Sequence, residues 1–222
     1  MRMSSLSMPS GPSKMHTTIS EWHNTPLHRL MLATLIEKLE NKLLANPSAT
    51  RVLEQWIHTY NLAPDSNLHA HRQTESSAPC PPFLLQTLLG TSDTQTEDVH
   101  YRKVQLTAHG KVFSEAENWY IPARLSPEMA TQLNTTDKPF GLVVAALNFS
   151  RQLIKRESLW FPLPEHWEQE GIPAGSTQPI SLPPYLFRHM AVLRAQTGQA
   201  FCVVIETYTT EALGFPPPAM PA

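Results

Sequence analysis

Two long stretches of the chain are rich in strand-forming residues and fold back on themselves at a glycine turn. The first spans residues 99–121 and turns at the dipeptide HG (109–110). The second spans residues 185–208 and turns at the segment QTGQ (196–199). Runs of this length, rich in Val, Phe, Tyr and Thr around a Gly-containing turn, are typical of β-hairpins. We therefore expect two antiparallel hairpins in the second half of the chain.

The first half of the chain has the periodicity of helices. Thr25 followed by Pro26 is a typical helix start, and leucines then recur at helical spacing up to residue 46. Ser48 opens a second helix that ends near residue 60, and Ser126 opens a further one. Residues 82–89 (PFLLQTLL) read as a short apolar helix closed by a glycine.

Helices and strands thus come in runs and do not alternate strictly, which favours an α+β fold with an antiparallel sheet. We expect the sheet to use residues 99–121, 148–160 and 185–209. Helices from residues 25–60 and 82–89 should pack against it.

The composition supports one folded domain between two tails. Hydrophobic residues make up 41% of the 222 residues and charged residues 16%, which is enough apolar material for a core. Residues 1–20 are rich in Ser, Met and Pro, and residues 213–222 are rich in Pro. We expect a domain over residues 21–212, with an added helical hairpin at 21–62 and a polar, Pro-rich connection after it.

Charge and cysteine content exclude several classes of partner. A formal net charge of −2 gives no broad attraction for nucleic acid or an anionic membrane. No segment approaches the roughly 20 apolar residues that span a bilayer. Residues 1–20 lack the apolar stretch of a secretory signal, and only two cysteines occur. These features predict a cytoplasmic protein without a disulfide framework.

Two charged residues fall at strand positions that should be buried. Arg102 shares its parity with Val104, and Glu206 shares its parity with Val204. An isolated buried guanidinium or carboxylate costs several kcal/mol unless it is paired or meets a ligand. An arginine can grip a ligand carboxylate through two hydrogen bonds, and a glutamate can exchange a proton with a ligand hydroxyl. Alternatively the two residues pair with each other, or one lies at a solvated edge.

The order of these segments resembles the chorismate lyase family. The resemblance rests on YRKVQLTAHGK (101–111), SPEMATQLNTTDKPFG (126–141), LNFSRQLIK (147–155) and the terminal strand VVIETY (203–208). It covers roughly residues 99–209. It implies a six-stranded antiparallel sheet with helices over one face, enclosing a small-ligand pocket.

The resemblance also implies a reaction and its residues. Arg102 would hold the carboxylate of chorismate or of 4-hydroxybenzoate, and Glu206 would act where the enolpyruvyl group leaves. The reaction is an elimination of pyruvate that needs no metal or organic cofactor. The alternative is a non-catalytic binding module for a small aromatic carboxylate on the same fold.

One position departs from the family pattern. The family places a second arginine in the returning strand, where this chain has Glu117, or Asn118 if the register slips by one. A glutamate there would repel a carboxylate, whereas Asn118 can still donate one hydrogen bond. Arg188 and its neighbour His189 are further candidates that either face the pocket or solvate an edge.

Two other sets of residues are assigned lesser roles. Arg151 matches a family segment and is expected to fix a loop. His69, His71 and Cys80 resemble metal ligands only by residue type, because they lie in a loop without a fourth ligand, so no metal site is expected.

Overall fold

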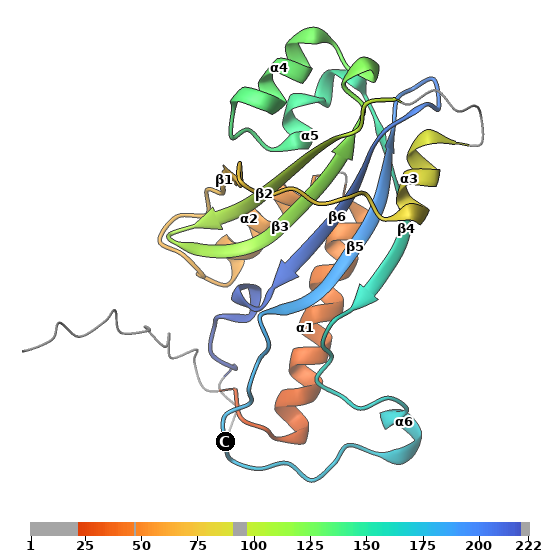
Figure 1. Ribbon diagram of the computed structural model, residues 1–222. Coiled ribbons are helices and arrows are strands. Elements are labelled where there is room, and N and C mark those ends of the chain that lie inside the picture. The colour runs from red at the N-terminus through yellow and green to blue at the C-terminus, as the bar shows by residue number, and fades with distance from the viewer. Residues whose placement is uncertain (1–21, 47, 91–96, 219–222) are drawn as a thin grey trace, which may run out of the picture.

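The computed structural model describes residues 22–46, 48–90 and 97–218. They form an α+β fold built on a six-stranded antiparallel sheet, in the order β1-β2-β3-β6-β5-β4 (Figure 1). The fold class expected from the sequence is therefore confirmed. The strands are β1 His69–Arg72, β2 His100–Ala108, β3 Lys111–Tyr120, β4 Ser150–Ser158, β5 Tyr185–Arg194 and β6 Ala200–Thr209.

The helices lie mainly before and between the two hairpins. They are α1 Pro26–Ala45, α2 Ala49–Thr59, α3 Pro82–Leu89, α4 Pro127–Thr135, α5 Phe140–Val143 and α6 Trp167–Glu170. Short 3₁₀ turns occur at η1 Pro122–Arg124, η2 Ala145–Leu147 and η3 Thr210–Leu213. No helix within the described residues is both long enough and apolar enough to cross a membrane.

The residues that the sequence marks as helix ends act as caps. The side chain of Thr25 accepts a hydrogen bond from the His28 N–H at the start of α1, and Ser48 caps α2 in the same way. Such caps satisfy N–H groups that have no partner inside the helix. Gly90 ends α3 with a φ of 78°, a conformation that costs glycine little.

The turns of both hairpins lie where the sequence predicts them. His109 and Gly110 join β2 to β3 with φ angles of 47° and 76°. Two successive positive φ angles give a tight turn whose twist matches that of the flanking strands. Gly198 supplies the positive φ, 84°, in the turn between β5 and β6.

The sheet has helices on both faces (Figure 1). We call one the α1 face, since its Leu106, Phe187 and Tyr208 belong to the same core cluster as the apolar residues of α1 and α2. At the other end of this face, Tyr120 and Cys202 pack with residues of α4 and α5. On the opposite side, the α3 face, residues of β3, β5 and β6 pack with Leu84 and Leu88 of α3. The expectation of helices over a single face is therefore corrected.

Two segments differ from the sequence-based expectation. The polar connection after the helical hairpin contains β1, which pairs with β2 from His69↔Thr107 to Arg72↔Val104. Its four residues, HAHR, contain one small apolar side chain, so no apolar alternation predicts this edge strand. The core also continues past residue 212, because Leu213 and Phe215 are buried against the N-terminal helices.

Candidate functional site

Arg102 lies on β2, on the α1 face, and only 3% of its surface is exposed. Its Nε donates to the Leu133 carbonyl at 3.1 Å, and Nη2 donates to the carbonyls of Thr136 (3.1 Å) and Lys138 (2.7 Å). Nη1 is buried and has no hydrogen-bond partner among the residues that the structure describes. Arg102 thus ties the end of α4 to the sheet, while the NH₂ group of Nη1 stays unpaired among the described residues.

The surroundings of Arg102 disfavour its charge. Burial lowers the pKa of the Arg102 guanidinium below its usual value, and the positive charge of the nearby Arg72 lowers it further. An arginine stays protonated all the same, because its ordinary pKa lies far above neutrality. A buried cation of this kind attracts an anion.

Asn118 takes the place beside Arg102. The two residues are register partners on β2 and β3, and the Asn118 side chain is buried on the α1 face. Its Nδ2 contacts the Arg102 carbonyl at 3.4 Å. Glu117 points to the α3 face, where it accepts a hydrogen bond from the Tyr101 hydroxyl at 2.7 Å. The residue opposite Arg102 is therefore an amide, and Glu117 does not repel an anion bound there.

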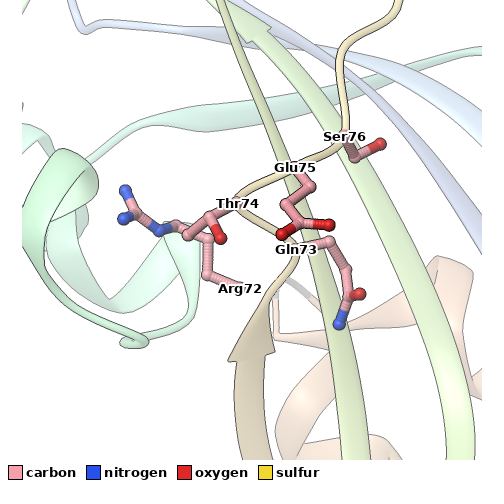
Figure 2. Close-up of a pocket in the computed structure, with 5 residues that line it drawn as sticks. All are labelled: Arg72, Gln73, Thr74, Glu75 and Ser76. Carbon is pink, nitrogen blue, oxygen red and sulfur yellow. The ribbon is translucent and has the colours of Figure 1, made fainter.

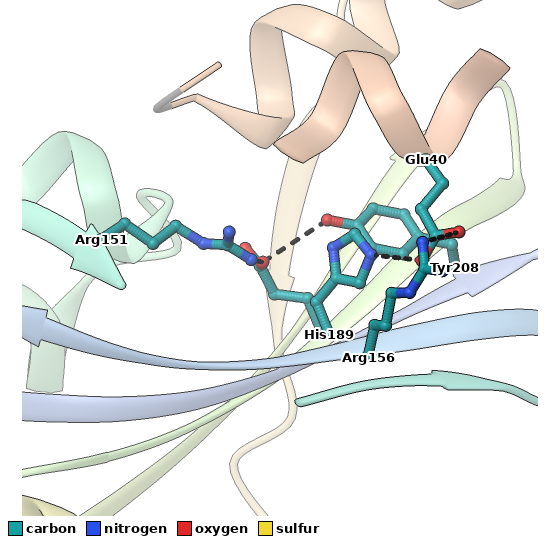
Figure 3. Close-up of polar contacts among 6 residues, drawn as sticks. Glu40, Arg151, Arg156, His189 and Tyr208 are labelled. Carbon is teal, nitrogen blue, oxygen red and sulfur yellow. Dashed lines mark hydrogen bonds and ion pairs between the residues drawn. The ribbon is translucent and has the colours of Figure 1, made fainter. Parts of the chain in front are cut away.

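Glu206 lies on the α1 face of β6 and forms an ion pair with Arg151 of β4 (Figure 3). The side chains of Arg151 and Glu206 are only 13% and 19% exposed. The pair spans the intervening strand β5, and the register places Ala191 midway between the two residues. A methyl side chain leaves room for the two long side chains to meet above it.

The Arg151–Glu206 pair perturbs its neighbours. Burial alone would lower the pKa of Arg151, but the charge of Glu206, the nearby Tyr208 and the hydrogen bond to Glu206 together outweigh burial and raise the pKa. The Tyr208 hydroxyl donates to the Glu206 carboxylate at 3.4 Å. Burial, and then the negative charge of Glu206, raise the pKa of Tyr208 well above its usual range. Tyr208 is thus a neutral hydrogen-bond donor.

A second polar group lies directly beside the first. His189, the register partner of Glu206, is fully buried, and its Nε2 lies 3.1 Å from the Glu40 carboxylate of α1. Arg156 of β4 approaches the same carboxylate at 3.7 Å. Figure 3 shows the His189 ring next to Tyr208, with Glu40 and Arg151 to either side. The other ring nitrogen of His189, Nδ1, has no hydrogen-bond partner within residues 22–46, 48–90 and 97–218.

Three of the four predicted site residues share one face. Arg102, Asn118 and Glu206 all lie on the α1 face, but Arg102 and Glu206 are held by different partners and do not pair with each other. Arg188 lies on the α3 face, where its Nε donates to Glu157 at 2.7 Å. Arg188 is therefore not brought together with the other three.

Helix α1 contributes a polar residue that was not predicted from the sequence. Glu40 lies one helical turn after Ile36 and one before Leu43, inside the apolar stripe that packs on the sheet. A carboxylate within such a stripe signals a buried polar partner, which is His189. Arg151, which was expected to fix a loop, instead neutralises Glu206.

The described residues form surface hollows, of which two stand out, and neither of these two is lined by Arg102 or Glu206. One, of about 370 Å³, lies along Arg72–Ser76 (Figure 2). The other, of about 430 Å³, lies between α1 and α2, where Lys42, Arg51 and His58 contribute to its wall. An enclosed pocket that contains both Arg102 and Glu206 stays a prediction. Within the described ranges, no three His, Cys, Asp or Glu side chains are grouped to hold a metal ion.

These features define an α+β protein with buried polar and charged side chains on one face of an antiparallel sheet. The chain is 38% identical over 201 residues to "Uncharacterized protein y4mC" of Sinorhizobium fredii (strain NBRC 101917 / NGR234). The match covers 90% of this chain and 84% of the relative. The chain therefore belongs to the family of that protein. No family model matches the chain.

Among solved structures, the chain is similar to the effector domain of PhnF from Mycobacterium smegmatis. That match has a TM-score of 0.41 and 16% identity, and covers 73% of this chain and 88% of the other. The possible transcriptional regulator YydK from Bacillus subtilis matches with a TM-score of 0.39 and 17% identity over 70% of this chain. The chain spans 62% of the length of the YydK structure.

Proposed function

We propose that this protein binds a small aromatic carboxylate, with Arg102 as the anion anchor. The observation that carries the proposal is Nη1 of Arg102, a buried cationic donor that finds no hydrogen-bond partner in the described part of the chain. Leaving such a donor unpaired costs free energy, and a ligand carboxylate would remove that cost. Asn118, on the neighbouring strand, adds an uncharged amide and no competing anion.

The aromatic part of the ligand is inferred from the residues around the anchor. On the α1 face, the register positions between Arg102 and Glu206 include Val104, Ala116 and Val204. These side chains are small and apolar, and they suit the face of a flat ring. Tyr120, two positions along β3 from Asn118, packs edge to face with Phe140, with ring centroids 5.5 Å apart.

Ligand entry requires movement of the segment after α4. Nη2 of Arg102 is bonded to the carbonyls of Thr136 and Lys138, which lie over the guanidinium. A carboxylate that binds Nη1 and also reaches Nη2 would displace at least one of these carbonyls. The exchange keeps Nη2 paired while Nη1 gains its acceptor, so binding and movement of this segment are coupled.

A second candidate function is elimination of pyruvate from chorismate. Glu206 favours it, because a carboxylate lies on the same face as the anion anchor. In that reaction Glu206 would handle the proton at the end of the ring from which the enolpyruvyl group leaves. Here, however, both Arg151 and Tyr208 already contact that carboxylate. Glu206 is thus engaged in a structural pair, which favours binding over catalysis.

The first experiment measures affinity for 4-hydroxybenzoate by calorimetry. Replacing Arg102 by Gln or Lys should weaken binding about 30- to 700-fold, which corresponds to roughly 2–4 kcal/mol for loss of a buried charge-assisted contact. Arg188→Gln, on the opposite face, is the matched control and should leave affinity within about threefold. Circular dichroism checks that each variant folds. Wild-type protein that does not bind at millimolar concentration would refute the proposal.

The second experiment separates binding from catalysis. Purified protein is incubated with chorismate, and released pyruvate is followed. A binding module should release none above the uncatalysed rate. Release that Glu206→Gln abolishes, while affinity for 4-hydroxybenzoate is kept, would establish the lyase reaction instead.

A further inference from the structure

Two buried side-chain nitrogens lack a hydrogen-bond partner within the described residues, and both lie on the α1 face. One is Nη1 of Arg102, and the other is Nδ1 of His189. Buried polar atoms are nearly always paired, so each unpaired one calls for an explanation. A bound carboxylate would pair with Nη1 of Arg102, but Nδ1 of His189 would still lack a partner.

The contacts of His189 define what its free nitrogen can do. Nε2 lies 3.1 Å from the Glu40 carboxylate, which can only accept hydrogen bonds, so Nε2 carries the hydrogen. In the neutral ring, Nδ1 is then a hydrogen-bond acceptor with a free lone pair. The Phe187 and Tyr208 rings, with centroids 5.4 Å and 5.5 Å from that of His189, hold the imidazole in place. Nδ1 thus lacks a donor, and an oriented O–H group would supply one.

The charged neighbours do not supply that donor. Arg156 is directed at Glu40, and Arg151 is directed at Glu206. The Tyr208 hydroxyl is also directed at Glu206. Each donor around His189 in the described part of the chain is therefore engaged elsewhere.

We propose that His189 accepts a hydrogen bond from a hydroxyl group of the bound ligand, so that the ligand is a hydroxy acid. This inference rests on the proposed function, in which Arg102 holds the carboxylate. The two residues come from β2 and β5, three strands apart, and His189 is two positions along the strand from the register row of Arg102. Strand geometry puts their Cα atoms roughly 16 Å apart. Such a span suits a rigid ligand with the acid and the hydroxyl at opposite ends.

The test compares pairs of acids that differ only in the hydroxyl group. 4-Hydroxybenzoate is paired with benzoate, and the longer 4-hydroxycinnamate is paired with cinnamate. In the wild type, the hydroxyl should tighten binding about 5- to 150-fold in at least one pair, the range expected for pairing a buried acceptor. His189→Phe should remove this difference and keep affinity for the acid without the hydroxyl within about threefold. The control is Tyr208→Phe, which changes a buried neighbour of His189. This variant should keep the difference in affinity between the acids with and without the hydroxyl.

The outcomes separate this inference from the proposed function. Equal affinity within both pairs, with Arg102 still required, would overturn the role of His189 and leave the anion site standing. A difference that persists in His189→Phe would overturn it as well. If none of the four acids binds, the proposed function itself fails. If His189→Phe does not fold, the ¹⁵N chemical shift of Nδ1 in the wild type provides the test. This shift must change when the hydroxy acid binds and must not change when the matched acid without the hydroxyl binds.

Discussion

The ion pair between Arg151 and Glu206 makes a sharp prediction about stability. The pair joins β4 to β6 across β5, and its side chains are 13% and 19% exposed. Removing one partner leaves the other charge poorly solvated, which typically costs 3–5 kcal/mol for a fully buried pair. Because this pair keeps some contact with water, we expect Arg151→Met to lower the free energy of unfolding by about 2–4 kcal/mol. In a chain of this size the melting temperature should fall by roughly 5–15 °C.

A double-mutant cycle isolates the contribution of the pair. Unfolding in urea is followed for the wild type, Arg151→Met, Glu206→Gln and the double variant. The double variant should be more stable than the sum of the single effects predicts, with a coupling of about 1–3 kcal/mol, because no unpaired charge remains. The matched control is the pair of Arg188 and Glu157, whose side chains are 36% and 31% exposed.

The control cycle should give only about 0.2–1 kcal/mol, the usual range for a solvated pair. Additive effects for Arg151 and Glu206, with a coupling below about 0.5 kcal/mol, would refute the reasoning from burial. Equal coupling in the two cycles would refute it as well.

Two further predictions concern the same sheet. Ala191→Leu should lower the free energy of unfolding by about 1–3 kcal/mol, because the larger side chain fills the position above which Arg151 and Glu206 meet. A variant that unfolds in urea with the same free energy as the wild type would contradict this. Burial would raise the pKa of Glu115, but hydrogen bonds with Gln105, Lys103 and Tyr185 and the charge of Lys103 together outweigh it and lower the pKa. Its contribution to stability is therefore present above the unfolded-state pKa, about 4.3, and is lost as pH falls through the lower folded-state value. Glu115→Gln should flatten the decline of melting temperature between about pH 5 and pH 3, and an unchanged slope would argue against this assignment.

Much of the fold follows from local sequence patterns. The caps at Thr25 and Ser48, and the glycine turns of the two hairpins, are decided by residues close together in the chain. The strand β1 could not be found in this way, because its pairing with β2 uses backbone groups and its four residues have no apolar alternation. Likewise, Phe215 is buried in a core cluster with residues of α1 and α2, which lie at the other end of the described chain.

The candidate site was predictable only in part. Strand parity correctly placed Arg102 and Glu206 on one face, because side chains alternate along any strand. The partners of these charges come from β4 and from the loop after α4, and no local pattern reveals such contacts. Arg188 was assigned to the site by sequence position, although it immediately precedes His189 and so must point to the opposite face.

Two tryptophans join the beginning of the described chain to its end. Nε1 of Trp22 donates to the carbonyl of Phe215, and Nε1 of Trp56 donates to that of Ala212, both at 2.8 Å. Residues 22 and 215 are therefore neighbours, and a short linker could connect them covalently. A circular permutant that is opened at the exposed turn His109-Gly110 would keep both indole contacts and all six strands. In such a molecule the chain would begin with the segment from β3 to β6, and β2 would be its last strand.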